Sequence, residues 1–561
     1  MSGGAADWPG GLPGVLESAL DAASADGPFH PAATARLDAG EEFPTEACAV
    51  LDACGIARAY VPGPLGGAPG GLPELVAALR AVARRDVTVA VAHGKTFLGS
   101  VPAWVAGGEG QRRELAAAVL DGAVVSWGLT EPGHGSDLLA GELTAVPAPG
   151  GGWRLDGAKW PVNNATRGRF VSVLARTETD GGPRGFSVFL VDKERLAPGS
   201  WRPLPKEPTH GIRGADISGV RFEGAHVPGD ALTGGAGEGL EIVLRSLQLT
   251  RTVCTSLSLG AGEHALRLAH RFAAGRALYG TTLLRLPLAR RTLGRAAASL
   301  ELADAAALLA ARSAHCLTGE MSVVSAVVKA GVPDIVQESI DDLAELVGAR
   351  GFLTGQHEYG HFQKLERDHR IVAIFDGSTA VNRSALISQF PVLARRFRDG
   401  GHDAAGLASA VAAGPVPPLD FAALRLTSRT GCSVVQALPA VAARLGELAA
   451  DGAVPGRVHE LAGALAEETA AVAEALAAPR PAGRSTPPEA FAAARRYERC
   501  YAGAAAAHLL LAGHGDPERV TRLTAALDRA LELLRPGHEA PQGAYEPMVA
   551  ALEEPAKELI A

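Results

Sequence analysis

The spacing of apolar residues changes twice along this chain, and this change restricts the possible folds more than any other feature. Up to residue 122, apolar residues recur every three or four positions, for example from Leu72 to Arg85, which predicts amphipathic helices. From 123 to 233 the spacing becomes two, in short segments that Gly, Pro and Asp residues separate, which predicts strands. The helical spacing then returns, and residues 251–274 and 292–314 are long stretches without proline. The pattern predicts a helical domain over 1–122, a small β domain over 123–233 and a second helical domain over 234–398.

The chain continues to residue 561 after this second helical domain. The continuation begins with a Gly-rich segment and the run Pro415-Val-Pro-Pro418, which is typical of a linker. Farther along, apolar residues fall on one face of a helix, at Val458, Leu461, Leu465, Val472 and Leu476. We therefore expect an additional folded helical domain over 399–561.

Composition restricts the location and the partners of the protein. The chain is 47% hydrophobic with a net charge of −8, and it has no apolar run long enough to span a bilayer, so we expect no transmembrane segment. The start, Met1 to Asp7, lacks the basic and apolar regions of an export signal, which favours a cytoplasmic protein. Six cysteines without a C-x-x-C pair fit reduced thiols. A mildly acidic chain also argues against nucleic acid as a partner.

Residues 129–137, Leu-Thr-Glu-Pro-Gly-His-Gly-Ser-Asp, follow an apolar, partly β-branched segment that is typical of a strand. Gly133 and Gly135 give the backbone the freedom that close contact with a ligand requires. The same residues also form tight turns that bind nothing. From spacing alone, both interpretations remain open.

The stretch 129–137 resembles the flavin-binding signature of the acyl-CoA dehydrogenases, which typically runs Thr-Glu-Pro-x-x-Gly-Ser-Asp. Four further segments resemble this family in the same order: Ala92-His-Gly94, Lys159-Trp-Pro-Val-Asn-Asn164, Gly275-Arg-Ala-Leu-Tyr-Gly280 and Arg367 to Ser378. The resemblance implies a mainly α fold with a central β domain: an N-terminal helical domain, a middle β-barrel domain and a C-terminal four-helix bundle. The extension resembles the extra helical domain of the very-long-chain acyl-CoA dehydrogenases.

The resemblance also implies an activity, the removal of an α proton and a β hydride from an acyl thioester by an FAD enzyme, which gives the trans-2-enoyl product. The family usually places its base in a Tyr-Glu-Gly-Thr motif, which Phe375-Asp-Gly-Ser378 matches, so Asp376 is the expected base. An alternative base position in some members corresponds to Thr250, which cannot accept the proton. Asp is one methylene shorter than Glu, and without the family Asp376 could equally cap the next helix.

Several residues match family positions that contact the flavin ring or the substrate. Trp127, Leu129 and Thr130 match strand positions along the isoalloxazine, and Ser136 matches a hydroxyl between flavin and substrate. Trp160 matches a flavin-facing tryptophan. Val162 stands where the family commonly has a Thr whose hydroxyl meets N5, and Val has no hydroxyl to donate. The remaining expected contacts are Arg251 and Gly377 with the substrate and Ser378 with the cofactor.

A second group matches positions that bind the pyrophosphate and adenine of a neighbouring subunit's FAD. Arg276 and Tyr279 match an Arg-x-x-Phe element, where the Arg would pair with phosphate, or would otherwise be a solvated cation. Glu345, Gly348 and Ala349 match a motif that normally begins with Gln and contains paired glycines. A Glu near phosphate would be unfavourable, so Glu345 either points elsewhere or accepts from a ribose hydroxyl.

Two histidine-containing features do not follow from the resemblance. His357-Glu-Tyr-Gly-His361 is a literal H-E-x-x-H sequence, which on a helix would bind zinc, but Gly360 and the loop context argue against a helix, so we expect no metal. His134 lies inside the signature, where it either contacts substrate or flavin or lies at the loop surface.

The expected partners follow from the resemblance: an acyl-CoA or acyl-carrier-protein substrate, an electron-transferring flavoprotein or oxygen as electron acceptor, and further copies of the chain in a homodimer or homotetramer. Two alternatives remain. One is a flavin monooxygenase on the same scaffold, and the other is a non-catalytic paralogue. An acid at residue 376 favours the dehydrogenase, because neither alternative requires it.

Overall fold

The computed structural model describes residues 11–478 and 485–553. The expectation about an export signal rests on residues 1–7, which lie outside this range. Contacts divide the chain into two compact units, Met1–Thr250 and Arg251–Ala561. Across the described residues, every helix is too short or too polar to cross a lipid bilayer.

The first unit begins with helices, as the spacing of its apolar residues predicts. The predicted helix over 72–85 is present as Gly71–Ala83. The longest helix of this region, Val87–Ala106, is capped by Asp86, whose side chain accepts a hydrogen bond from the Val89 amide. The helices are α1 Gly11–Asp26, α2 Pro31–Gly40, α3 Thr45–Ala53, α4 Gly71–Ala83, α5 Val87–Ala106 and α6 Glu109–Leu120.

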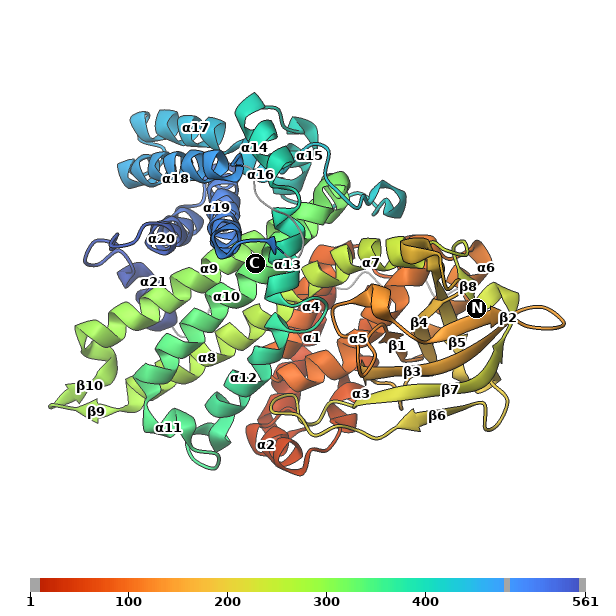
Figure 1. Cartoon of the computed structure of the whole chain (residues 1–561). Coiled ribbons are helices and arrows are strands. Elements are labelled where there is room, and N and C mark those ends of the chain that lie inside the picture. Colours follow the sequence, from red (N-terminus) through yellow and green to blue (C-terminus); the bar gives the residue numbers. More distant parts are fainter. Residues whose placement is uncertain (1–10, 479–484, 554–561) are drawn as a thin grey trace. The chain divides into compact units, whose positions relative to one another are not determined.

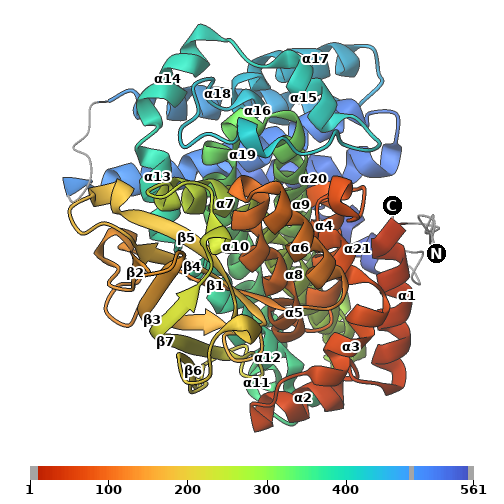
Figure 2. The same ribbon diagram turned by 90° about the vertical axis from the view of Figure 1, so that its right-hand side faces the viewer.

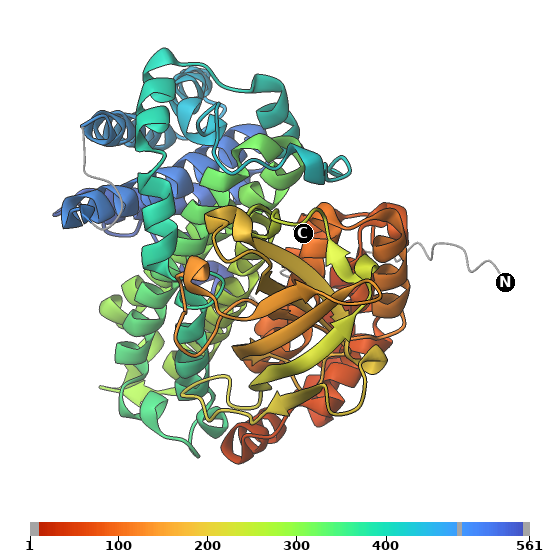
Figure 3. The ribbon, with the colours of Figure 1, turned by 45° about the vertical axis from the view of Figure 1, so that its right-hand side comes forward.

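The sheet of the first unit occupies the region where the spacing becomes two (Figure 3). Its hydrogen-bonded order is β6-β7-β3-β2-β4-β5-β8, and β1 pairs with β4 in parallel. The strands are β1 Val125–Gly128, β2 Thr144–Pro147, β3 Trp153–Asn163, β4 Phe170–Arg176, β5 Phe186–Asp192, β6 Trp201–Leu204, β7 Ile217–Val227 and β8 Leu232–Thr233. The longest antiparallel pairing joins β3 to β7, with irregularities between Leu155 and Asp156 and between Lys159 and Val162.

Two apolar clusters stabilise this sheet. One lies among β2, β3, β4, β5 and β7 and includes Leu155, Val173 and Phe222. The other joins the strands to residues of helix α7, Gly239–Val253, through Phe186 and Ile242. Trp127 and Leu129 pack at the edge of this second cluster. The end of β1 therefore rests on a buried apolar base, which fixes the start of the signature stretch.

The second unit contains a bundle in which α8, α9 and α10 run side by side (Figure 1). Its elements up to residue 387 are α8 Thr255–Gly275, β9 Ala277–Leu278, β10 Thr281–Thr282, α9 Pro287–Cys316, α10 Met321–Val347, α11 Ala349–Phe352, α12 His361–His369 and α13 Thr379–Ile387. The proline-free stretch 251–274 is helical, as its pattern predicts, but it contains a junction at Cys254, because α7 ends at Val253 and α8 begins at Thr255. Cys254 keeps a right-handed backbone (φ −58°, ψ −22°), so no Gly or Pro marks the junction.

The extension is helical, as predicted, and it packs on the bundle within the second unit. Helix α19 contacts α9, α10 and α13, while α17, α18, α19 and α20 pack on one another (Figure 2). The predicted apolar face of α18, from Val458 to Leu476, is buried. The helices are α14 Phe390–Asp399, α15 Ala404–Val411, α16 Ser433–Gln436, α17 Leu438–Ala450, α18 Gly456–Leu476, α19 Pro488–Ala512, α20 Pro517–Leu534 and α21 Glu546–Glu553.

Candidate functional site

The signature stretch of the first unit lies directly beside strand β3. The Trp160 amide donates to the Thr130 carbonyl at 2.9 Å, and the Thr130 hydroxyl donates to the Pro161 carbonyl at 3.1 Å. The Lys159 ammonium reaches the Leu129 carbonyl at 3.0 Å. Residues from two separate sequence motifs are therefore hydrogen-bonded side by side.

Glu131 fixes the loop that follows. Its carboxylate is buried and accepts hydrogen bonds from Lys159 Nζ at 2.7 Å and from the amides of Glu142 and Leu143. Burial alone would raise the pKa of Glu131, but the Lys159 ion pair and the two amides outweigh it, so the pKa is lowered. Glu131 is therefore an ionised structural anchor of the signature.

The signature contains the tight turn that its composition predicts. The amides and carbonyls of Glu131 and His134 bond to one another across Pro132 and Gly133. His134 Nε2 lies 3.3 Å from Glu142 Oε1, which gives this histidine a partner within the loop. Ser136 is exposed beyond the turn. Its hydroxyl is therefore accessible, as a contact with a ligand would require.

The side chains that resemble ring-contacting positions differ in accessibility. Trp127, Leu129 and Trp160 are half-buried, and the Trp160 indole donates to Glu207 Oε1 at 3.1 Å. Val162 is only 2% exposed. Within the described part of the chain, the buried Trp127 Nε1 has no hydrogen-bond acceptor. Unsatisfied buried donors are rare, and one beside an apolar surface is consistent with a ligand that supplies the acceptor.

The second unit brings Asp376, Arg251 and Cys254 together. Arg251 Nε donates to the Asp376 carbonyl at 3.2 Å, and Cys254 Sγ lies 3.2 Å from Asp376 Oδ2. Asp376 has φ +55°, a left-handed conformation that is uncommon for residues other than glycine, and Gly377 follows at φ +89°. Burial lowers the pKa of Arg251 to about 10, although Asp376 and Cys254 act in the opposite direction. The guanidinium is thus a largely dehydrated cation held against the Asp376 segment.

A buried lysine supports the same segment from helix α10. Lys329 is fully buried, and its ammonium donates to the Val372 carbonyl at 2.6 Å and lies 3.4 Å from the Gly377 carbonyl. The next residue, Ser378, caps α13 by accepting a hydrogen bond from the Val381 amide. The helix cap considered for Asp376 is therefore formed by Ser378. Sequence reasoning missed both Lys329 and Cys254, because neither lies in a motif and both contacts span many residues.

The residues expected to bind the far end of FAD lie at the opposite end of α8. Arg276 directly follows α8, and Tyr279 lies in the turn of the β9–β10 hairpin, where it is 88% exposed. The last turn of α8 contacts the segment after α10, through the Arg271–Glu358 ion pair and the Phe272–His357 ring contact. The other three expected residues, Glu345, Gly348 and Ala349, are exposed at the end of α10. Because α8 has 21 residues, this group is roughly 30 Å from the start of α8, where Cys254 contacts Asp376.

The H-E-x-x-H sequence does not form the helix that a zinc motif requires. His357, Glu358 and Tyr359 have φ values of 49°, 54° and 57°, and α12 begins only at His361. His357 packs against Phe272, whereas His361 contacts His264. The two imidazoles of the motif are thus committed to different neighbours. No cluster of three or more His, Cys, Asp or Glu among residues 11–478 and 485–553 could hold a metal ion.

These groups fit the chemistry of a bound flavin. The first unit offers half-buried indole and leucine surfaces, an unsatisfied indole N–H and an accessible serine hydroxyl. The second unit offers the exposed guanidinium of Arg276, a group suited to phosphate. Val162 departs from this pattern, because it is buried and carries no hydroxyl.

Comparisons with known proteins place both units in one family. Residues 126–225 match the model of the acyl-CoA dehydrogenase middle domain, and residues 237–389 match the acyl-CoA dehydrogenase C-terminal domain. The chain is 28% identical over 355 residues to a probable acyl-CoA dehydrogenase, FadE25, of Mycobacterium tuberculosis, covering 63% of this chain and 89% of the relative.

Solved structures show the same fold. An acyl-CoA dehydrogenase from Bacillus anthracis complexed with FAD has a TM-score of 0.67 at 19% identity, and the match covers 97% of this chain and 91% of that one. The prolyl acyl carrier protein oxidase AnaB has a TM-score of 0.61 at 20% identity, over 67% of this chain and 97% of that one. Two consecutive domain models and the Mycobacterium relative agree, and residues 126–225 and 237–389 therefore form the middle and C-terminal domains of the acyl-CoA dehydrogenase family.

Proposed function

We propose that this chain is an FAD-dependent enzyme that converts an acyl thioester into its trans-2-enoyl thioester, with Asp376 as the acceptor of the α proton. The class of reaction, oxidation of a CH–CH bond, is that of the family. The single observation that carries the assignment is the Asp376 segment, whose carbonyl is held by Arg251 and whose carboxylate is contacted by Cys254. Asp376 matches the position where the family usually has its base, and an acid whose backbone and carboxylate are both held by neighbouring side chains is suited to proton removal.

Different residues of this chain would remove the proton, hold the base and stabilise the thioester carbonyl. Asp376 takes the proton at a carboxylate oxygen, and Arg251 and Lys329 hold the backbone around it. The Gly377 amide is the expected donor to the thioester carbonyl as negative charge develops there. By family analogy, Trp127, Leu129 and Trp160 would hold the ring of the cofactor, and the Ser136 hydroxyl would contact it. FAD, when bound, supplies the acceptor for the β hydride.

The enzyme is proposed to act as a homo-oligomer. Arg276 lies roughly 30 Å along α8 from the Asp376 contact, and the family resemblance implies that this far end of the helix would serve the FAD of a neighbouring subunit. Under this arrangement Arg276 would pair with the pyrophosphate of an FAD held mainly by another copy of the chain. Glu345, exposed at the same end, then needs a ribose hydroxyl rather than phosphate as its neighbour.

The acyl carrier is either coenzyme A or a carrier protein. The Mycobacterium relative is named for acyl-CoA, and AnaB acts on an acyl carrier protein. An electron-transferring flavoprotein or oxygen would reoxidise the enzyme. A panel of acyl-CoA and acyl-carrier-protein thioesters, added anaerobically while the flavin absorbance is recorded, separates the two carriers.

The decisive variant is Asp376→Asn, which removes the base and preserves shape. We expect it to bind FAD and substrate but to lose at least about a hundredfold in the rate of flavin bleaching, because general bases contribute on that order. Asp399→Asn, an exposed substitution at the end of α14, is the matched control and should bleach normally. Bleaching of Asp376→Asn at the wild-type rate would refute the assignment.

A further inference from the structure

We propose that Cys254 is a positioning residue for this reaction, because its thiol holds the Asp376 carboxylate in the orientation that proton removal requires. This inference rests on the proposed function, in which Asp376 is the base. It adds to that function a residue to which the family resemblance assigned no role.

The geometry of the contact is that of a hydrogen bond from a thiol to a carboxylate. Cys254 Sγ is 3.2 Å from Asp376 Oδ2, and the thiol is the donor. Cys254 is 3% exposed, so water competes little for this bond. Burial strengthens such a contact, because the effective dielectric constant is lower than in water.

Cys254, at the junction after α7, and Arg251, in the last turn of α7, both contact Asp376, and the backbone stays right-handed through Cys254. They are three residues apart, a spacing that places both side chains on one face. Arg251 Nε donates to the Asp376 carbonyl, which fixes the backbone, while Cys254 contacts the carboxylate, which restrains rotation of the side chain. Arg251 and Cys254 thus hold both the backbone and the side chain of Asp376.

This restraint matters because Asp376 is shorter than the Glu that the family usually has. A shorter side chain reaches the α-carbon over a narrower range of orientations, and angstrom-scale misplacement can slow a reaction on the order of a hundredfold. The backbone is also in a left-handed conformation, at φ +55°, which points the side chain in an unusual direction. The Cys254 contact on the carboxylate, added to the Arg251 contact on the backbone, compensates for both the short side chain and its unusual direction.

The simplest competing explanation is that Cys254 only fills space at the junction of α7 and α8. The two explanations predict different effects when the thiol is replaced by a hydroxyl, which is also a hydrogen-bond donor. Cys254→Ser keeps a donor, Cys254→Ala removes it, and Cys254→Val fills the volume without a donor. If Cys254 positions the Asp376 carboxylate, activity depends on whether residue 254 has a hydrogen-bond donor and not on the volume of its side chain.

The first measurement is the anaerobic rate of flavin bleaching at saturating thioester, together with the apparent affinity for the thioester. We expect Cys254→Ala and Cys254→Val to lower the rate about threefold to tenfold, the equivalent of one hydrogen bond, with little change in affinity. Cys254→Ser should recover most of the rate. Cys500→Ala, which truncates another fully buried cysteine in α19, is the matched control and should leave the rate unchanged.

The second measurement needs neither flavin nor substrate. The S–H stretching band of Cys254 is identified in the infrared spectrum as the band that Cys254→Ala removes. In Asp376→Asn this band should move to higher frequency, because an amide oxygen is a weaker acceptor than a carboxylate. An unmoved band, or equal rates for Cys254→Ala and the wild type while Asp376→Asn is inactive, overturns the inference alone. Normal bleaching by Asp376→Asn overturns the proposed function itself.

Discussion

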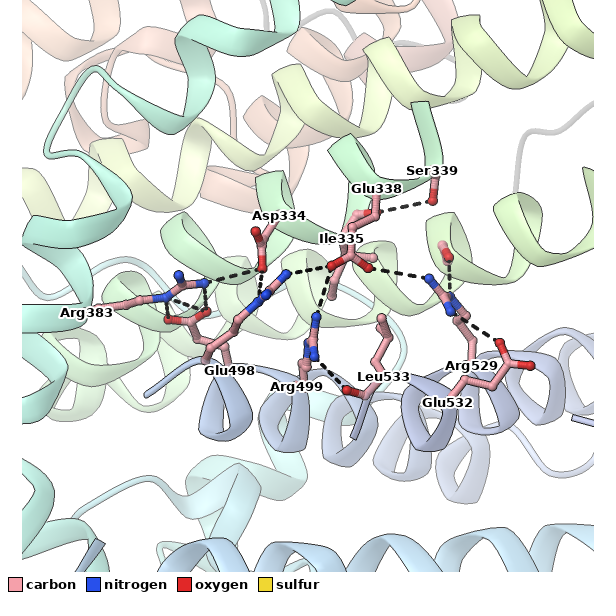
Figure 4. Close-up of polar contacts among 12 residues, drawn as sticks. Asp334, Ile335, Glu338, Ser339, Arg383, Glu498, Arg499, Arg529, Glu532 and Leu533 are labelled. Atoms are coloured by element: carbon pink, nitrogen blue, oxygen red, sulfur yellow. Dashed lines mark hydrogen bonds and ion pairs between the residues drawn. The ribbon is translucent and has the colours of Figure 1, made fainter. Parts of the chain in front are cut away.

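Arg383 and Glu498 form a two-point ion pair that joins helix α13 of the bundle to helix α19 of the extension. Arg383 Nε lies 2.9 Å from Glu498 Oε1, and Arg383 Nη2 lies 2.8 Å from Glu498 Oε2 (Figure 4). The side chain of Glu498 is 1% exposed. Burial raises the pKa of the Glu498 carboxyl to about 7, and the facing Arg383 guanidinium acts in the opposite direction, favouring the charged form.

The ion pair belongs to a row of charges between α10 and the extension. Asp334 contacts Arg383, and Glu338 contacts Arg499 (Figure 4). Arg495 contacts both Asp334 and Glu338. The row continues to Arg529 of α20, which lies 3.6 Å from Glu338. Specific charge pairs as well as apolar contacts therefore fix the extension on the bundle within the second unit.

We expect Arg383→Met to destabilise the protein by about 3–5 kcal/mol, because it leaves the Glu498 carboxylate buried without its principal partner. Urea unfolding, followed by circular dichroism, measures the change. The double variant Arg383→Met/Glu498→Met should recover part of the loss, since both charges are then absent. Arg444→Met removes an exposed ion pair with Glu447 and should cost less than about 1 kcal/mol. Equal losses for Arg383→Met and Arg444→Met would contradict the prediction.

The order of helical and β regions could be predicted from the sequence because it depends on local spacing. The apolar face of α18 and the helix over 72–85 were predictable for the same reason. The junction at Cys254 was not, since its backbone remains right-handed and no breaker residue marks it. The charge row between α10 and α19 was also hidden, because its partners are separated by more than a hundred residues.

The candidate site could likewise be predicted only where its residues lie in local sequence motifs. Asp376 and the signature stretch could be identified because they lie in motifs that resemble a family. Cys254 and Lys329 reach the Asp376 segment only after folding, from positions that no motif includes. The left-handed conformation of Asp376 was equally unpredictable, because Asp-Gly is compatible with several turns.

Gly377→Ala should both destabilise the protein and slow proton removal. Gly377 has φ +89°, a backbone conformation that is strained for alanine, and an added Cβ would lie 3.0 Å from Arg251 Nη2. The substitution would therefore both strain the backbone and displace Arg251. We expect a loss of about 1–3 kcal/mol in stability and on the order of a hundredfold in the bleaching rate. Gly400→Ala is the matched control: Gly400 has φ +68° but open space around it, so it tests strain without the contact. A bleaching rate unaffected by Gly377→Ala would show that this segment tolerates displacement.

His369 should make the protein sensitive to acid. Its ring is 1% exposed and bonded on both sides: Nδ1 lies 2.8 Å from Gln337 Oε1 and Nε2 lies 2.9 Å from the Ser258 hydroxyl. Burial, assisted by nearby Arg370, lowers the pKa of His369 to about 3 from its usual 6.5. The folded protein therefore holds this imidazole neutral at a pH where the unfolded chain protonates it.

The sign of the effect follows from proton binding. Between pH 6.5 and about 3 the unfolded state binds one more proton at His369 than the folded state, so the free energy of unfolding falls as the pH is lowered. The contribution is about 1.4 kcal/mol per pH unit. Urea unfolding at intervals from pH 7 to 4 measures this slope. His369→Gln should be less stable at neutral pH but should have a shallower slope, whereas His514→Gln, at an exposed position, should keep the wild-type slope. Identical slopes for His369→Gln and the wild type would mean that the imidazole is already protonated in the folded protein.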